Sequence, residues 1–331
     1  MRRRQTVEGL ITIAVLVIAW PVLSLAHVPY VQSLAALIAI YYLLAVSLNV
    51  IMGYTDLISF GQAAFFGVGA YSAVLTATHL GAGLLGGVLV GVVLSAVLAL
   101  VVSSVSRTLS GVYFALATMA AAEIVHIVIL NWVDLTRGPL GLSLKGADRV
   151  LVPGVPLSGD AVFQLIMGVS IVVTIGIFLF VRSDTGVRTI GVRENAALSA
   201  SIGIVPTRQR AIAFLISGVV ASVGGALYAF NYGILTPAVS SLTYSALALL
   251  MVIFGGKGTI LGPLVGAAVF VVLPEAIGLQ GALGQVAFAV VLLIVVLLLP
   301  RGVVGSIATH GGGVGGAIGM IRARTARKKE A

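Results

Sequence analysis

Long apolar runs without charge constrain this chain more than any other feature. Residues 161–181 and 211–231 each contain 21 residues and no Asp, Glu, Lys, Arg or His. A helix needs roughly 20 apolar residues to cross the hydrocarbon core of a bilayer. Both runs are apolar on every face, which excludes amphipathic surface helices. Charged residues are 9% of the chain, against about a quarter in soluble domains, so the bilayer is its expected solvent.

Eight more apolar segments extend this pattern along the chain. The sequence therefore predicts an all-α, polytopic membrane helix bundle with about ten transmembrane segments. Two segments, 243–255 and 263–277, are separated by the turn GGKGTILGP and are expected to be short or broken helices. The predicted spans are 10–26, 32–52, 63–80, 83–102, 112–131, 161–181, 211–231, 243–255, 263–277 and 282–299.

The distribution of Lys and Arg predicts the orientation of these spans. If the N-terminus is inside and the spans alternate, inner segments hold 16 of the 19 basic residues and outer segments hold 3. This bias fits the positive-inside rule, so both termini are expected to be cytoplasmic. The charge is then explained by orientation, and no nucleic-acid partner is expected. A signal peptide over 1–26 is the alternative, but its apolar run is longer than usual.

The remaining segments define the domain organisation. We expect one transmembrane domain over 1–309 and a Gly-rich, then basic, cytoplasmic tail over 310–331. The composition of this tail predicts a disordered segment that is attracted to anionic lipid. The longest outer loop is 132–160, where Pro and Gly predict turns and where there is room for a short helix on the membrane surface. The longest inner loop is 182–210.

The chain lacks the usual reagents of catalysis. It has no Cys and 4 His, and it contains no H-E-x-x-H or G-x-S-x-G motif. The segment GGKGT has Gly258 where a nucleotide-binding P-loop requires Ser or Thr. We therefore expect a membrane protein that is not an enzyme, with no cofactor, no metal site and no nucleotide site of its own. If it transports a cargo against a gradient, the energy would come from an ion gradient or from another subunit.

Glu123 and His126 stand out because they lie inside a predicted span. They are three residues apart, so they are expected to share a helix face. One interpretation is a proton relay or a polar point in a translocation pathway, as in an ion-coupled secondary transporter. The other is a satisfied polar pair between packed helices, which is favoured because no second acid or base accompanies the pair at membrane depth.

Small residues dominate two further segments, 53–75 and 255–270. Each combines a Gly-rich turn with a helix of small residues, a pattern that lets helix backbones approach closely. Interrupted helices can also expose backbone groups beside a transport pathway. The candidate residues for a helix break or pathway are Gly53, Gly61, Gln62, Gly255, Gly256 and Gly262.

The inner loop 182–210 holds five arginines and a run of helix-forming residues that ends at Gly203. A helix of about two turns outside the bilayer is marginal alone. Either it docks on a partner protein that supplies force, or it is a solvated loop whose arginines contact lipid.

The chain resembles the integral membrane permeases of ABC importers for branched-chain amino acids, the LivM type. The resemblance covers about residues 40–300. It rests on GYTDLISFGQAAFFGVGAY, GVYFALATMAAAEIVHIVILNWVDLTRGPLGL, GVRENAALSASIGIVPTRQRAIAFLISGVVASVGGALYA and LLMVIFGGKGTILGPLVGAAVF. The chain departs from the family where Gln62 replaces a His and where Ala196 and Ala200 stand in place of an acid.

This resemblance implies a coupling loop that contacts an ATP-binding subunit. The residues that it assigns to this loop are Arg188, Arg193, Glu194, Ala196, Ala197 and Gly203. It also implies a bacterial-type inner membrane and three kinds of partner: a homologous second permease subunit (LivH-like), two ATP-binding subunits and an extracytoplasmic substrate-binding protein. The implied cargo is branched-chain or other hydrophobic amino acids. Urea or short amides, an ion-coupled secondary transporter and a membrane scaffold without transport remain alternatives.

Overall fold

Helices account for nearly all of the regular structure. The computed structural model describes residues 2–25, 28–105, 109, 111–144, 149–277 and 302–304 of the 331-residue chain. Seven of its helices are long and apolar enough to cross a membrane, which confirms the predicted all-α polytopic bundle. These are α1 (Arg2–Leu25), α2 (Pro29–Thr55), α3 (Gln62–Leu80), α4 (Gly83–Val105), α5 (Gly111–Asn131), α7 (Gly159–Arg182) and α10 (Pro206–Tyr232).

Two shorter apolar helices, α11 (Leu242–Gly255) and α12 (Gly262–Ile277), follow. Their 14 and 16 residues give lengths of about 21 and 24 Å at 1.5 Å per residue. Both fall short of the roughly 30 Å hydrocarbon core, as expected from the interrupted sequence. The predicted span 282–299 and the tail 310–331 lie outside the described residues, so the total of ten spans stays a prediction.

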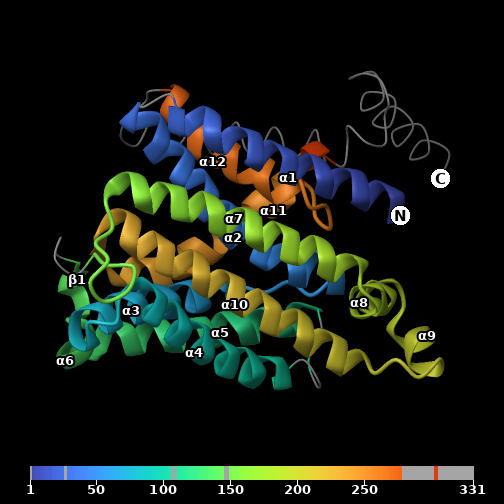
Figure 1. The fold of residues 1–331 in the computed structure, drawn as a ribbon. Coiled ribbons are helices and arrows are strands. Elements are labelled where there is room, and N and C mark those ends of the chain that lie inside the picture. The colour runs from blue at the N-terminus through green and yellow to red at the C-terminus, as the bar shows by residue number, and fades with distance from the viewer. Residues whose placement is uncertain are drawn as a thin grey trace.

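The bundle has two distinct ends (Figure 1). At one end lie the N-terminus of α1 and two helices outside the long spans, α8 (Asp184–Glu194) and α9 (Ala196–Ser201). At the other lie α6 (Val133–Thr136) and the strand β1 (Leu142–Ser143). These are called the α8–α9 end and the β1 end below. Pairs of spans joined by short turns, such as α3 and α4, run antiparallel between the two ends.

The β1 end is built by the predicted outer loop. It contains α6, the 3₁₀ helix η1 (Gly138–Leu140) and β1, and β1 pairs antiparallel with β2 (Ile234–Leu235), which follows α10. A second 3₁₀ helix, η3 (Pro237–Ser240), then leads into α11. Arg149 donates from Nη2 to the carbonyl oxygen of Asn231 over 3.5 Å. The outer loop is thereby anchored to the end of α10.

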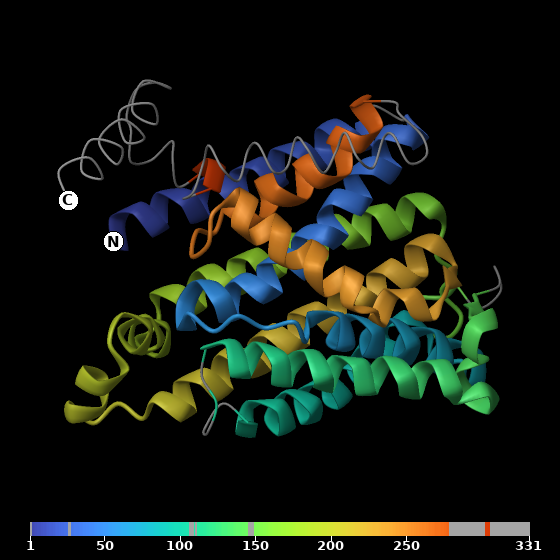
Figure 2. The same ribbon diagram turned by 180° about the vertical axis from the view of Figure 1, so that it is seen from behind.

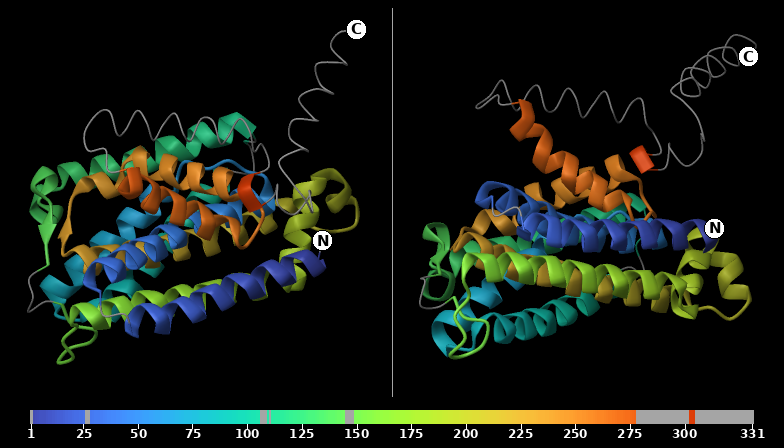
Figure 3. Two further views of the ribbon diagram at one scale, coloured as in Figure 1. Left: turned by 90° about the horizontal axis from the view of Figure 1, so that it is seen from above. Right: turned by 45° about the horizontal axis from the view of Figure 1, so that its top comes forward.

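The core is centred on α2, α3 and α10. Every residue of α2 from Tyr42 to Thr55 is buried, and α10 packs extensively on both α3 and α2. By contrast, α1 lies outside this core beside α7 (Figures 1 and 3) and exposes mainly aliphatic side chains, as a helix facing lipid would.

Glycines allow α3 and α10 to meet at their backbones. A Cβ added at Gly225 of α10 would overlap the carbonyl of Phe66, and one added at Gly69 of α3 would overlap the carbonyl of Ser222. Small residues permit this approach, which is a main source of packing energy between membrane helices.

We predict that Gly225→Ala destabilises the bundle, because the added methyl group meets backbone that cannot move aside. Overpacking of this kind costs roughly 1–3 kcal/mol, so the thermal unfolding midpoint of the detergent-purified chain should fall by several degrees. Gly176→Ala in α7 is the matched control, since its new Cβ has no neighbour within 4 Å. Equal midpoints for the two variants would contradict the close approach of α3 and α10.

Candidate functional site

The helical path breaks between α2 and α3, in a segment where Leu57, Ser59 and Gly61 are buried. Residues 56–61 are not helical, and the first N–H groups of α3 have no partner within their own helix. The N–H of Phe60 donates to Thr118 Oγ1 of α5 over 3.1 Å. The N–H of Ala63 donates to Ser245 Oγ of α11 over 2.9 Å. A break in a membrane protein requires such partners, and here neighbouring helices supply them.

Gln62 joins the three core helices at this break. Its side chain is fully buried. Its Oε1 accepts from Ser47 Oγ of α2 (3.1 Å), and its Nε2 donates to Ser217 Oγ of α10 (2.9 Å). Ser217 Oγ in turn donates to the carbonyl of Ser47 over 2.7 Å. The predicted break residues Gly61 and Gln62 therefore lie where α2, α3 and α10 meet.

A second turn, residues 256–261 between α11 and α12, docks on the end of α2. Asn49 Nδ2 donates to the carbonyl of Thr259 (2.8 Å), and Asn49 Oδ1 accepts from the N–H of Gly258 (2.8 Å). The amide side chain thus pairs with the turn as a peptide group would. A Cβ on Gly53 would lie 2.7 Å from the nitrogen of Gly258, so this contact requires glycine.

The other predicted glycines shape the same turn. Gly256 has φ +120°, a conformation that side chains other than glycine rarely adopt. A Cβ on Gly255 would overlap the backbone of Gly262, so α11 and α12 touch where the turn begins. The two Gly-rich segments, 53–75 and 255–270, are therefore brought together at one place in the structure.

The predicted inner loop is largely helical and forms an elbow, defined here as residues 183–203. Ser183 caps α8 by accepting from the N–H of Gly186 (3.2 Å), and Asn195 caps α9 by accepting from the N–H of Leu198 (2.9 Å). Gly203 has φ +84° just after α9. The expected short helix ending before Gly203 is present as α9, whereas the longer helix α8 before it was not foreseen.

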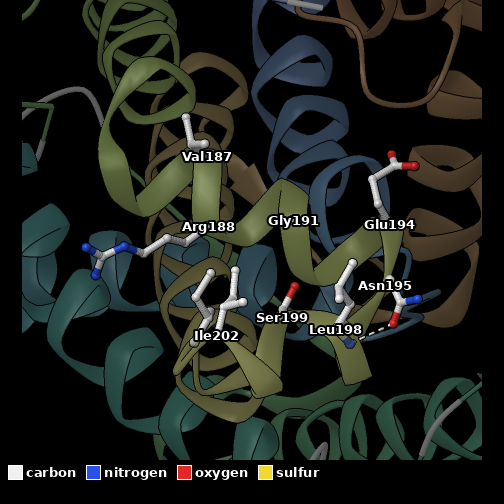
Figure 4. A pocket seen from close by; sticks show the side chains of 9 residues that line it. Val187, Arg188, Gly191, Glu194, Asn195, Leu198, Ser199 and Ile202 are labelled. Carbon is white, nitrogen blue, oxygen red and sulfur yellow. Dashed lines mark hydrogen bonds between the residues drawn. The ribbon is translucent and has the colours of Figure 1, made fainter.

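An apolar groove of about 370 Å³ runs along this elbow (Figure 4). Leu198 and Ile202 line it and are 63% and 71% exposed. Of the predicted coupling residues, Arg188 and Glu194 also line the groove, and Ala197 is exposed beside it. Figure 4 shows the lining side chains, and the complete set is Val187, Arg188, Gly191, Glu194, Asn195, Leu198, Ser199, Ile202 and Ile204.

Arg193 connects this elbow to the core. Its Nη1 donates to the carbonyl of Gly53 over 2.6 Å, and its Nη2 lies 3.1 Å from Glu194 Oε1. Gly53 is in the last turn of α2, where carbonyls lack intrahelical donors and the helix dipole favours a cation. Thr189 Oγ1 also donates to Gln209 Oε1 of α10 (3.2 Å). The elbow is thus tied to both α2 and α10.

Glu123 and His126 have different surroundings, although both lie on α5. His126 Nδ1 is 2.9 Å from Ser240 Oγ of η3 and is half-buried. Glu123 is exposed on the outside of the helix. Among the described residues, no hydrogen bond joins the two, so the pair expected from their spacing is not formed. A charged side chain facing lipid at mid-span costs on the order of 3 kcal/mol.

Sequence reasoning missed the polar groups that hold the break and the turn together. Each is a polar residue inside a largely apolar run, and the sequence gives no signal that tells which of them meets the break or the turn. They are Ser47, Asn49, Thr118, Ser217 and Ser245. Among the residues that the structure describes, no cluster of three His, Asp or Glu could hold a metal ion.

Residues 30–300 match the family described as branched-chain amino acid transport system / permease component. The chain belongs to this family. The resemblance drawn from the sequence motifs is thereby confirmed, and the chain is a membrane permease subunit of this transport family.

Individual relatives agree with the family. The chain is 26% identical over 291 residues to the high-affinity branched-chain amino acid transport system permease protein LivM of Salmonella typhimurium, covering 80% of this chain and 67% of that protein. It is 27% identical to LivM of Escherichia coli over the same length and shares. It is 26% identical to the autoinducer 2 import system permease protein LsrC of an Enterobacter strain, over 48% of this chain and 49% of that protein. No solved structure matches the chain significantly.

We predict that Gln62→Leu lowers the stability of this permease. The change keeps the size of the side chain but leaves buried hydroxyls without their amide partner. The free energy of unfolding should therefore fall by about 1–3 kcal/mol. Thermal unfolding in detergent would measure it. Thr78→Val is the control, because within the described part of the chain Thr78 bonds to the carbonyls of its own helix and to no other group. A Gln62→Leu midpoint no lower than that of the control would contradict the role of Gln62 in joining the helices.

Proposed function

We propose that this chain is the transmembrane permease subunit of an ABC importer, which passes branched-chain or other hydrophobic amino acids inward by alternating access. Its family membership and the names of its LivM relatives support this cargo. The observation that carries the mechanism is the bond from Arg193 to the carbonyl of Gly53. It connects a surface elbow, suited to a soluble partner, with α2, one of the core helices of the bundle.

The α8–α9 end is the proposed cytoplasmic end. The basic side chains described there include Arg182, Arg188, Arg193, Arg208, Arg210 and Lys257, whereas Arg137 and Arg149 lie at the β1 end. This asymmetry supports a cytoplasmic location for the elbow and for both termini. Two ATP-binding subunits would then dock at the α8–α9 end. An extracytoplasmic binding protein would deliver cargo at the β1 end, and a LivH-like second permease subunit would complete the pathway.

The elbow has the surface that a protein partner would cover. Leu198 and Ile202 are 63% and 71% exposed, and Val205, two residues after the elbow, is 55% exposed. Apolar side chains gathered outside the bilayer mark an interaction site. A helix as short as α9 is also marginal without support. We therefore assign Arg188, Arg193, Glu194, Ala196, Ala197 and Gly203 to the ATPase-coupling segment.

Motion of the ATP-binding subunits would reach the core through three contacts. Arg193 would pull on the end of α2, and Thr189 would pull on α10 through Gln209. Asn49 would pass the displacement to the turn 256–261. The break before Gln62 would let α3 tilt relative to α2 without the loss of helical hydrogen bonds. The energy would come from ATP bound by the partners, so this chain needs no nucleotide site.

One measurement separates the importer from an ion-coupled secondary transporter, whereas a change of cargo would not alter its outcome. Urea or short amides would be a different cargo for the same machine. An ion-coupled secondary transporter would use a cation gradient and would centre on Glu123. Uptake that continues after collapse of the proton gradient, while ATP is maintained, supports the importer. Two results together would overturn the proposed importer: uptake stops when the proton gradient is collapsed, and uptake does not require the ATP-binding subunits.

We predict that Leu198→Asp weakens binding of the ATP-binding subunits at least tenfold. A tenfold change corresponds to about 1.4 kcal/mol, and placing a carboxylate in an apolar contact costs at least that much. Co-purification from detergent measures the binding. Leu140→Asp is the matched control, because Leu140 is 89% exposed at the opposite end. Normal recovery of ATP-binding subunits with Leu198→Asp would show that the elbow is not their docking site.

We predict that Arg193→Ala uncouples ATP hydrolysis from uptake. The variant removes a charged hydrogen bond worth about 1.5–3 kcal/mol, so uptake per ATP hydrolysed should fall about tenfold while the subunits still associate. Lys257→Ala is the control, since the pair of Lys257 with Asp56 is more than half exposed and such pairs contribute little. Unchanged coupling in Arg193→Ala would remove the proposed transmission path.

A further inference from the structure

One face of α5 does not suit lipid. Six of its exposed residues recur every three or four positions and form a continuous line along the helix, which is called the α5 stripe here; Val112, Ile124 and Val128 are exposed beside this line. In Figure 2, α5 and α4 run along the same side of the bundle. The α5 stripe consists of Tyr113, Leu116, Ala120, Glu123, Ile127 and Asn131.

The neighbouring helix α4 shows what a lipid-facing surface of this protein looks like. Its large exposed side chains are all aliphatic: Leu85, Leu89, Val90, Val93, Leu94, Val97, Leu100 and Val101. The α5 stripe instead carries a phenol, a carboxylate and an amide. This contrast on adjacent helices indicates that the two faces meet different surroundings in the assembled protein.

Glu123 lies where a carboxylate is least compatible with lipid. It is the 13th of the 21 residues of α5, about 18 Å from the start of the helix at 1.5 Å per residue. That is near the middle of a hydrocarbon core of roughly 30 Å. Among the described residues, no hydrogen bond or ion pair engages Glu123. His126, one turn later, is hydrogen-bonded to Ser240 instead.

We infer that the α5 stripe lines the water-filled pathway of the assembled importer and that the Glu123 carboxylate binds the ammonium group of the cargo amino acid there. This inference rests on the proposed function, because it requires an amino acid as cargo. A carboxylate and an ammonium group form a strong charge-assisted hydrogen bond. Ala120, one turn before Glu123, is small and leaves room beside the carboxylate.

A hydrogen bond links the helix break before α3 to α5, the helix that carries Glu123. Thr118 lies on the opposite, buried side of α5 and accepts the hydrogen bond from the N–H of Phe60. A rearrangement of the break would therefore shift α5, and with it the depth or direction of Glu123. Binding of the cargo and movement of the core helices would be coupled through one side chain.

The competing explanation is that Glu123 forms an ion pair with a basic residue of the second permease subunit. In that case Glu123 would be shielded from water in the assembled importer, and assembly of the two subunits would require Glu123. Exposure to water and dependence of assembly on Glu123 are therefore the two properties that separate these explanations.

The natural absence of cysteine makes the first test direct. Ala120→Cys and Ile127→Cys in the α5 stripe, and Val93→Cys on the lipid face of α4, are each labelled in the complete importer with a charged, water-soluble thiol reagent. Thiolates form in water and not in lipid. We expect both stripe variants to react at least tenfold faster than Val93→Cys, and saturating leucine to slow them. Stripe rates as low as that of Val93→Cys would overturn the inference.

The second test removes the charge. Glu123→Gln should lower leucine uptake at least tenfold at saturating loaded binding protein, with wild-type recovery of the partner subunits, and Glu123→Asp should restore part of it. Asp160→Asn, which changes an exposed carboxylate in the first turn of α7, is the control. Normal uptake by Glu123→Gln, or loss of the second permease subunit, would overturn the inference. Absence of ATP-dependent uptake by the wild type would instead contradict the proposed function.

Discussion

The structure depends on one constraint: backbone polar groups inside a membrane protein must find partners within the protein, because lipid offers none. The break before α3 would be unstable without Thr118, Ser245 and the Gln62 network. The turn between α11 and α12 depends in the same way on Asn49. These few polar residues decide where an otherwise apolar bundle can be interrupted, and in the proposed mechanism the interruptions are the places where its helices would move relative to one another.

The same constraint explains how far sequence reasoning reached. The length of a local apolar run determines where a membrane helix lies. The predicted spans 63–80 and 83–102 therefore differ from α3 and α4 by at most three residues at any end. Gly61 and Gln62 could be identified as a break because a Gly-rich turn is also local. The partners could not be identified, since Gln62 meets Ser217 across 155 positions and Asn49 meets Thr259 across 210. A single sequence does not show which of many serines faces which turn.

The elbow illustrates a different limit. Its arginines predict a location outside the bilayer, and Gly203 predicts the end of α9, but the role of Arg193 depends on a carbonyl 140 positions away. Five arginines in one loop look equivalent in the sequence, and orientation alone would explain them all. Only the packing of α8 against α2 singles out the one that reaches the core. The exposure of Glu123 is likewise a property of how α5 is turned, which the spacing to His126 did not reveal.

Two arginines at opposite ends of the bundle make the same kind of contact. Arg193 donates to a carbonyl in the last turn of α2, and Arg149 donates to a carbonyl in the last turn of α10, where unpaired carbonyls and the helix dipole both favour a cation. Each arginine ties a segment outside the spans to a core helix. Ser217 and Ser47 then join those two helices at the centre. In the proposed importer, a displacement that begins at either membrane face therefore arrives at the same buried contact, beside Gln62, and this convergence would let docking on one side and ATP binding on the other act on one rearrangement.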